Sequence, residues 1–336
     1  MLIPIVSIGI ALLFIPYNIL FTWLSPLPNS IEHQVNDAIE AGLDGIIVYV
    51  DKAGAAPLLY SAGWKNRETQ TPADPNALFK IASISKLYIA AASVKLADQD
   101  SLHLEKTLLE YLPEQSTYIK NAATITLKSM LKHRSGIPNY TDHKDYPWSN
   151  PYKDNSAPLQ LIRNTPADFE PNTDFNYSNT NYLLIGEILD KTLGYSHHHY
   201  IKNEILEPLG LENTYNLLEQ THLEDVMSGY HVDYGPDIKS NDFIHPGSSM
   251  VATAQDVGIF LRALNEGQLF NDSEQIIYDA IYESEHTGLL PGYSSIARYY
   301  KDIDAVVVQL VNTSGGDSWA LSEINYNRIV KILSKQ

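Results

Sequence analysis

A serine and a lysine three residues apart, at the start of an apolar run, are the residues of this sequence best suited to nucleophilic chemistry. Ser83-Ile84-Ser85-Lys86 opens the run from Leu87 to Ala97. If the run is helical, Lys86 stands on the same face as Ser83. A serine hydroxyl needs a neighbouring base, and a lysine can be that base only if burial or nearby positive charge lowers its pKa. The start of a buried helix offers both conditions, together with free backbone N–H groups.

Two later strings carry further polar groups. Tyr177-Ser178-Asn179 precedes a predicted helix, and His286-Thr287-Gly288 is predicted as a turn that leads into a strand. Taken alone, each string is as consistent with an ordinary turn, and Ser-x-x-Lys with a polar helix start. The order of all three, each at the boundary of an element, favours a catalytic interpretation.

The elements that must position these strings are strands at both ends of the chain and helices between them. β-Rich runs predict a hairpin from 45–50 and 57–64, and later strands at 294–300 and 305–311. A Tyr-rich stretch over 135–157 is predicted as a long surface loop. We expect an α/β (α+β) fold, in which an antiparallel sheet from both chain ends is flanked by helices and a mainly helical lobe is inserted. The predicted helices are 81–99, 126–132, 158–163, 181–193, 198–206, 254–265 and 319–334.

Composition excludes several classes of function. The 336 residues are 44% apolar and 19% charged, as in an ordinary globular protein, and the formal charge is −17. A chain this acidic has no basic surface to neutralise phosphates, so nucleic acid is not an expected partner. The absence of cysteine excludes disulfides, thiolate nucleophiles and cysteine-ligated zinc.

The N-terminal segment is apolar and free of charge. Residues 1–27 contain no charged side chain, and about 20 apolar residues suffice to span a bilayer core. A cleaved secretory signal and a buried N-terminal helix are the alternatives. Five acidic residues follow before the first basic residue, Lys52, and a flank without Lys or Arg is the one more easily translocated. We expect residues 1–27 to be a membrane anchor (an N-terminal transmembrane helix) or a signal segment, and residues 28–336 to form one extracytoplasmic, periplasmic-face domain.

These strings identify a family resemblance. From about Gly45 to Leu333 the chain resembles the serine β-lactamase and D-Ala-D-Ala carboxypeptidase superfamily, closest to the class C-like branch that also holds esterases and D-aminopeptidases. The resemblance implies a β-lactamase/transpeptidase-like fold. Further strings that carry it are Phe79-Lys80-Ile81-Ala82-Ser83, Leu131-Lys132-His133-Arg134-Ser135-Gly136-Ile137-Pro138, Glu207-Pro208-Leu209-Gly210-Leu211 and Thr253-Ala254-Gln255-Asp256.

The resemblance implies catalytic roles for three residues. Ser83 Oγ would attack a carbonyl and become an acyl-enzyme, while Lys86 and the Tyr177 phenol would share the proton. A phenolate beside ammonium groups can act as a base and then return the proton to the leaving group.

Five further residues would bind substrate by the same resemblance. Asn179 would hydrogen-bond Lys86 or the substrate amide. His286, where many relatives carry lysine, would face Tyr177 and a substrate carboxylate, with Thr287 and Gly288 completing the string. Backbone N–H groups of Ser83 and Leu289 would form the oxyanion hole.

Departures from the family pattern leave the substrate open. No Glu-x-x-Leu-Asn string supplies the deacylating glutamate of class A β-lactamases, and the segment from Gly267 to His286 is short for the class C-like branch. We expect a serine hydrolase of carboxypeptidase or esterase type, without metal or cofactor, acting on a small-molecule or cell-wall peptide or ester. The alternatives are a class C-like β-lactamase and a penicillin-binding-like module with little turnover.

Other conspicuous residues are interpreted as structural. His197-His198-His199 is predicted as a solvated helix start, because consecutive helical residues point in different directions and do not converge on one ion. His133 is expected to be structural and Arg298 to be a surface arginine. The aromatic residues of the loop from Tyr140 to Tyr152 are expected to be partly buried and not to line a cleft.

Overall fold

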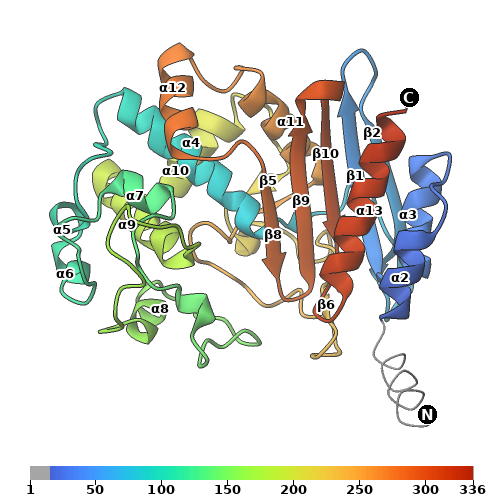
Figure 1. The fold of residues 1–336 in the computed structure, drawn as a ribbon, viewed down its shortest axis with the longest axis horizontal. Coiled ribbons are helices and arrows are strands. Elements are labelled where there is room, and N and C mark those ends of the chain that lie inside the picture. Colours follow the sequence, from blue (N-terminus) through green and yellow to red (C-terminus); the bar gives the residue numbers. More distant parts are fainter. Residues whose placement is uncertain (1–15, 336) are drawn as a thin grey trace, which may run out of the picture.

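Both ends of the chain contribute to one antiparallel sheet, which has six strands within residues 16–335, the part that the computed structural model describes (Figure 1). The strand order is β3-β2-β1-β10-β9-β8, and all neighbouring strands are antiparallel. N-terminal β1 therefore pairs with C-terminal β10, which confirms the predicted sheet. The strands are β1 (Gly45–Lys52), β2 (Leu58–Asn66), β3 (Thr71–Pro72), β8 (His286–Leu290), β9 (Tyr293–Tyr300) and β10 (Ala305–Val311).

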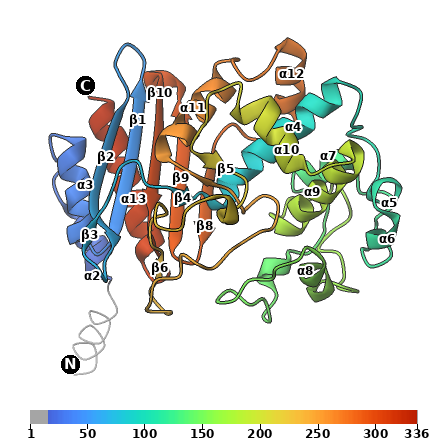
Figure 2. The same cartoon turned by 180° about the vertical axis from the view of Figure 1, so that it is seen from behind.

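Alternate side chains of the central strands enter two hydrophobic layers, because successive residues of a strand point to opposite faces. Val48 in β1 packs in the layer that contains α3 (Ile31–Glu40) and α13 (Ser318–Leu333). Its neighbour Tyr49 faces the other layer, with α11 (Ala254–Asn265) and α4 (Ser85–Asp98). Figure 2 shows α11 against the sheet on the side of the helical lobe.

The inserted lobe lies beyond the β8 edge of the sheet (Figure 1). Its central helix, α4, is buried on nearly all sides, as expected for a helix that is apolar around its circumference. The lobe also contains α5 (Leu108–Tyr111), α6 (Pro113–Ser116), α7 (Leu127–Leu131), α8 (Ser156–Leu161), α9 (Asn179–Leu193), α10 (His197–Ile201) and α12 (Asp272–Ile281). Short strands β4 (Phe79–Lys80), β7 (Val251–Ala252) and β5 (Thr214–Tyr215) pair beside it, and β6 (Tyr230–His231) pairs with β11 (Thr313–Ser314).

Besides the four-residue helices α5 and α6, two helices of ten residues form where the sequence predicted none. α3 begins after Ser30, whose side chain accepts from the N–H of His33, and α12 begins after Asn271, which accepts from the N–H of Glu274. Such caps satisfy N–H groups that a helix start leaves without partners. The predicted helix over 198–206 is interrupted instead, since α10 ends at Ile201 and a π-helical turn follows.

Part of the predicted surface loop over 135–157 is buried. Tyr140 and Tyr146 pack with ring centroids 5.4 Å apart, and both belong to the main core. The burial expected for the aromatic residues of this loop is therefore confirmed, and they hold the loop against the lobe.

The N-terminal segment is described only from residue 16, so most of the predicted anchor lies outside the described residues. Within residues 16–335 no helix is long and apolar enough to cross a membrane. The predicted transmembrane helix is therefore not supported there. Tyr17–Leu24 forms the short helix α2, and Arg328 of α13 donates to the carbonyls of Ser25 (2.8 Å) and Pro26 (2.6 Å). Residues that directly precede position 28 are thus attached to the body of the domain.

Candidate active site

Ser83 lies in the 3-10 turn Ala82–Ile84, immediately before α4. Ser85 Oγ ties this turn down, because it donates to Ala82 O (2.6 Å) and accepts from the N–H of Met250 (3.2 Å). Ala82 has a φ of +52°, a left-handed conformation that costs a non-glycine residue about 1–2 kcal/mol. The turn leaves Ser83 half-buried at the boundary between lobe and sheet.

Lys86 is fully buried, and its amine reaches three oxygen atoms. Nζ lies 3.1 Å from Ser83 Oγ, 2.8 Å from Asn179 Oδ1 and 2.9 Å from Gly247 O. It has no ion pair within the described part of the chain, so nothing offsets its desolvation with opposite charge. Burial lowers the pKa of Lys86 to about 7. The condition that the sequence argument set for a lysine base is therefore met.

Tyr177 packs over this amine. Its ring stacks on His133 with centroids 4.4 Å apart, and Lys86 Nζ lies 5.0 Å from the ring centroid. The phenolic oxygen is buried near the Ser83 hydroxyl, and none of residues 16–335 holds it in a well-formed hydrogen bond. Burial raises the pKa of Tyr177 above its ordinary value of 10.0, although the nearby Ser83 hydroxyl lowers it in part. The phenol is therefore protonated at neutral pH, and a resting phenolate is disfavoured.

Asn179, the first residue of α9, is oriented by two residues that the sequence analysis did not identify. Its N–H donates to Asn139 Oδ1 (3.0 Å), and its Nδ2 donates to Thr141 Oγ1 (3.0 Å). With its amide nitrogen engaged there, Oδ1 is left to accept from Lys86. Both residues lie in the loop predicted as surface, and no spacing signal distinguishes them from other loop residues.

The His-Thr-Gly string forms the beginning of β8 and not a turn before it, because its residues pair with β9 in regular register. Gly288 is required for a close approach. A Cβ there would lie 2.4 Å from Ile81 O and 2.9 Å from Ala82 Cβ. The edge of β8 thus packs against the turn that carries Ser83, and Leu289 follows on this edge with 54% of its surface exposed.

His286 is held by Tyr282, whose hydroxyl lies 3.0 Å from Nε2, and its Nδ1 contacts Thr287 O. Its ring centroid is 6.3 Å from that of Tyr177, so His286 lies beside Tyr177, as the family resemblance implies. Burial, with the positive charge of Lys86, lowers the pKa of His286 to about 4. The side chain is therefore neutral at pH 7, unlike the lysine of many relatives.

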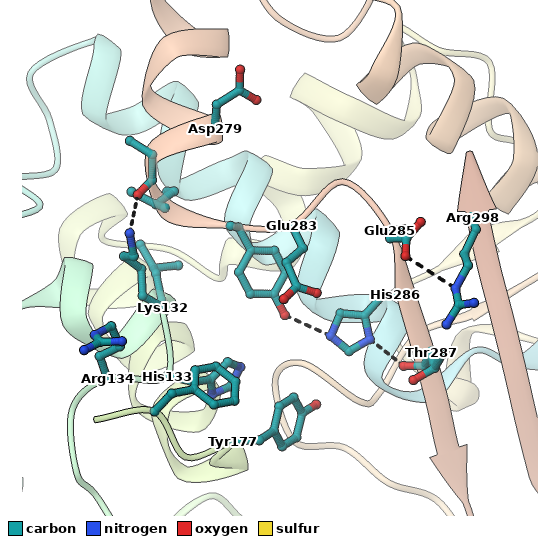
Figure 3. A pocket seen from close by; sticks show the side chains of 15 residues that line it. Lys132, His133, Arg134, Tyr177, Asp279, Glu283, Glu285, His286, Thr287 and Arg298 are labelled. Carbon is teal, nitrogen blue, oxygen red and sulfur yellow. Dashed lines mark hydrogen bonds and ion pairs between the residues drawn. The ribbon is translucent and has the colours of Figure 1, made fainter. Parts of the chain in front are cut away.

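A cavity of about 560 Å³ opens beside these residues (Figure 3). Tyr177, His286 and Thr287 lie on one side of it, and Lys132 and Arg134 lie across from them. The volume is suitable for a small substrate. The remaining lining residues are Leu131, His133, Phe175, Asp279, Ala280, Ile281, Tyr282, Glu283, Glu285 and Arg298.

Arg298 points away from Ser83. Its Nε pairs with Glu285 (3.4 Å), and its guanidinium lies 5.8 Å from the ring centroid of Tyr326 in α13. Ser295 of the same strand instead bonds to Ile81 O (3.1 Å), and residues an odd number apart face opposite sides of a sheet. Arg298 is thus placed as a structural arginine.

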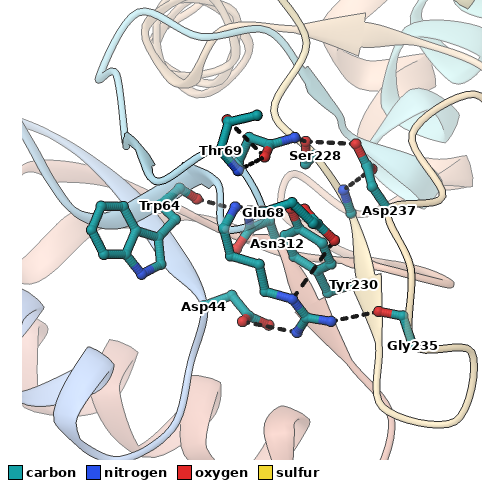
Figure 4. Close-up of polar contacts among 12 residues, drawn as sticks. Asp44, Trp64, Glu68, Thr69, Ser228, Tyr230, Gly235, Asp237 and Asn312 are labelled. Carbon is teal, nitrogen blue, oxygen red and sulfur yellow. Dashed lines mark hydrogen bonds and ion pairs between the residues drawn. The ribbon is translucent and has the colours of Figure 1, made fainter.

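The segment over 228–250, which brings Gly247 to Lys86, is fixed at two points. At its start Arg67 lies 4.0 Å from the ring centroid of Tyr230 and pairs with Asp44 (Figure 4). Further along, the buried Lys80 donates to Asn241 O (2.5 Å). Gly247 could not be predicted from the sequence, because a backbone carbonyl carries no residue-type signal.

Two of the histidines interpreted as structural are buried. His133 Nδ1 accepts from the N–H of Ser178 (3.1 Å), and burial lowers the pKa of His133 to about 3. His197 was predicted to be solvated, but it is buried and its Nδ1 lies 2.7 Å from Asp190 Oδ1.

Curated relatives resemble part of this chain. A protein named flp from Staphylococcus aureus (strain COL) is 29% identical over 194 residues, which are 56% of this chain and 39% of that protein. A penicillin-binding protein of Bacillus subtilis (strain 168) is 27% identical over 218 residues, 64% of this chain and 45% of that protein. The chain spans less than half the length of these relatives.

A solved structure shares the whole fold. D-amino acid amidase from Ochrobactrum anthropi SV3 superposes with a TM-score of 0.80 at 22% identity, covering 93% of this chain and 99% of that one. The family described as Beta-lactamase matches residues 33–278, which include the Ser83, Lys86 and Tyr177 positions. From this match, which covers more than half of its length, the chain belongs to the Beta-lactamase family.

Proposed function

We propose that this protein is a serine hydrolase that cleaves a small amide or ester through an acyl-serine at Ser83. The observation that carries the proposal is the buried Lys86 amine, 3.1 Å from Ser83 Oγ, with its pKa lowered to about 7. A neutral amine has two N–H groups and one lone pair. If the N–H groups donate to Asn179 Oδ1 and Gly247 O, the lone pair is left for the Ser83 proton.

Acylation then needs no outside reactant. The Ser83 Oγ–carbon bond forms as the Oγ proton moves to Lys86 Nζ. As the bond from the carbonyl carbon to the leaving nitrogen or oxygen breaks, Tyr177 gives its phenolic proton to the leaving group and takes one back from Lys86. The position of the phenolic oxygen supports this role, because it lies near the Ser83 hydroxyl and no described residue holds it in a well-formed hydrogen bond, so it can bond to an arriving leaving group. Water attacks the ester by the reverse path, releasing the acid.

The developing oxyanion would be bound by the backbone N–H groups of Ser83 and Leu289. The close packing of Gly288 on Ile81 supports this assignment, because it brings the β8 edge to the serine turn. Such donors act where negative charge grows in the transition state, and each is worth about 10²–10³ in rate.

The relatives support an amide or peptide substrate. A D-amino acid amidase shares the fold and a penicillin-binding protein shares part of the sequence. Within this class we propose small amides, esters or cell-wall peptides as substrates of carboxypeptidase or esterase type.

The test uses the full chain with a short-chain p-nitrophenyl ester, a D-Ala-D-Ala peptide and a fluorescent penicillin. Turnover and intact mass are followed for wild type, Ser83→Ala and Lys86→Met. We expect a Ser83-dependent acyl adduct, with turnover of the ester or the peptide. Rapid release of the penicilloyl group would identify a β-lactamase instead, and a stable adduct without turnover would identify a binding module. A folded protein that forms no adduct and turns over nothing would refute the proposal.

A further inference from the structure

The cavity lined by Tyr177, His286 and Thr287 contains a carboxylate, that of Glu283, which no described residue pairs with. Glu283 lies in the segment between α12 and β8, and Figure 3 shows its carboxylate on the side of His286. Its side chain makes no hydrogen bond or ion pair with any of residues 16–335. Its charge also reaches the site, since burial raises the pKa of Tyr177 and the negative charge of Glu283 raises it further.

The cations of the same cavity are engaged or lie elsewhere. Arg298 is paired with Glu285 and directed toward α13. Lys132 donates to Ala280 O (2.9 Å) and Arg134 donates to Asn172 O (2.8 Å), both across the cavity from Tyr177 in Figure 3.

His286, the remaining candidate cation on the near side, is neutral at pH 7 because burial lowers its pKa to about 4. Lys86 lies behind Tyr177, and its amine is already engaged with Ser83 Oγ, Asn179 Oδ1 and Gly247 O. A substrate carboxylate on the His286 side of the cavity would therefore meet Glu283 without a free cation of the lining to offset it. An ammonium group at the same place would be attracted by the Glu283 carboxylate. Discrimination of this kind arises as much from repulsion of the wrong charge as from attraction of the right one.

We propose that Glu283 makes this site selective for substrates that carry an ammonium group close to the scissile carbonyl, and that it disfavours a carboxylate at the same place. The inference rests on the proposed acyl-serine function and narrows its substrate class to amides or esters of amino compounds, in place of carboxypeptidase substrates such as a D-Ala-D-Ala peptide, whose carboxylate lies beside the scissile bond. Phe175, which lines the cavity with 55% of its surface exposed, offers apolar contact to the rest of such a substrate.

The test compares three p-nitroanilides of alanine, in D and L forms, that differ only at the α-nitrogen: free amine, N-acetyl and N-succinyl. At about pH 7 the free amine is mostly protonated, since an α-amino group titrates near pH 8. We expect kcat/KM for the amine to exceed that for the acetyl compound by about tenfold, mainly through KM, with the succinyl compound poorest. In Glu283→Gln the ratio of amine to acetyl kcat/KM should fall toward one.

Glu285→Gln is the matched control. It removes an equal charge only two residues along the chain, but the carboxylate it removes is already paired with Arg298. Its amine-to-acetyl ratio should stay within about twofold of wild type. A second readout needs no variant: the wild-type ratio should fall as pH rises through about 8 and the substrate amine loses its proton.

The outcomes separate the two proposals. If acyl adducts form on Ser83 but the acetyl or succinyl compound is preferred, or the ratio survives in Glu283→Gln, the charge selectivity is wrong and the hydrolase proposal stands. If no compound acylates Ser83 in folded protein, both proposals are wrong.

Discussion

Gly288→Ala perturbs the contact between β8 and the turn that carries Ser83. The new Cβ would lie 2.4 Å from Ile81 O, whereas real Cβ contacts rarely fall below 3.4 Å. Relief of this overlap requires β8 and the turn to separate by about 1 Å, and a displacement of that size at a reacting centre can cost about 10² in rate. We therefore expect kcat/KM toward a p-nitrophenyl ester to fall about 100-fold. Overpacking should also lower the unfolding free energy by about 1–3 kcal/mol.

The assay must separate displacement from instability. Initial rates and the rate of acylation by intact mass are measured at a temperature where far-UV circular dichroism shows the variant folded. Gly258→Ala is the matched control, because its Cβ would lie 2.1 Å from Tyr49 Cε1 in the layer between α11 and the sheet. We expect it to lose comparable stability while its acylation rate per folded molecule stays near wild type. A folded Gly288→Ala protein with wild-type kcat/KM would refute the assigned role of this contact.

Three further changes probe separate parts of the site. Because burial lowers the pKa of Lys86 to about 7, kcat/KM should rise as pH increases through about 7 and then level off. Lys86→Met should lose about 10²–10⁴ in acylation rate. A pH profile of kcat/KM that is flat from about pH 5.5 to 9 would contradict the lysine base. Asn139→Ala removes the acceptor for the N–H of Asn179. We expect the unfolding free energy to fall by about 1 kcal/mol in denaturant titrations and acylation to be about tenfold slower. An unchanged acylation rate would show that Asn139 does not position Asn179. Burial also lowers the pKa of Lys80 from 10.5 to about 7. Between these two pH values the unfolded chain binds more protons than the folded one, so the free energy of unfolding rises with pH. Lys80→Met should abolish on the order of 3 kcal/mol of this rise between about pH 7 and 9.5, and denaturant titrations that show the same rise in both proteins would contradict this.

Continuous apolar runs made the central strands of this fold predictable. β1 and β10 are buried on both faces and therefore read as continuous apolar runs, which local sequence reveals directly. A single sheet from both termini followed from the strands predicted at both ends of the chain, whereas the pairing of β1 with β10 itself was not predicted. α3 and α12 were missed because they are short and amphipathic, with apolar positions few enough to resemble loop.

The site was predictable only where side-chain type and spacing carry the chemistry. The structure brings Ser83, Lys86 and Asn179 within hydrogen-bond distance, from strings separated by more than 90 residues. Gly247 contributes a carbonyl, and Asn139 acts through the side chain of another residue, so neither leaves a pattern in the sequence. The charge states of the site side chains could not be predicted either, because the pKa of His286 depends on burial that only the folded chain creates.

The most direct test of the central claim is the mass of the intact protein after brief exposure to the p-nitrophenyl ester at about pH 8, followed by peptide mapping. The Lys86-activated serine predicts one acyl group on the peptide containing Ser83, absent in Ser83→Ala and strongly slowed in Lys86→Met. Undiminished turnover in Ser83→Ala, or an acyl group mapped to another residue, would contradict the account.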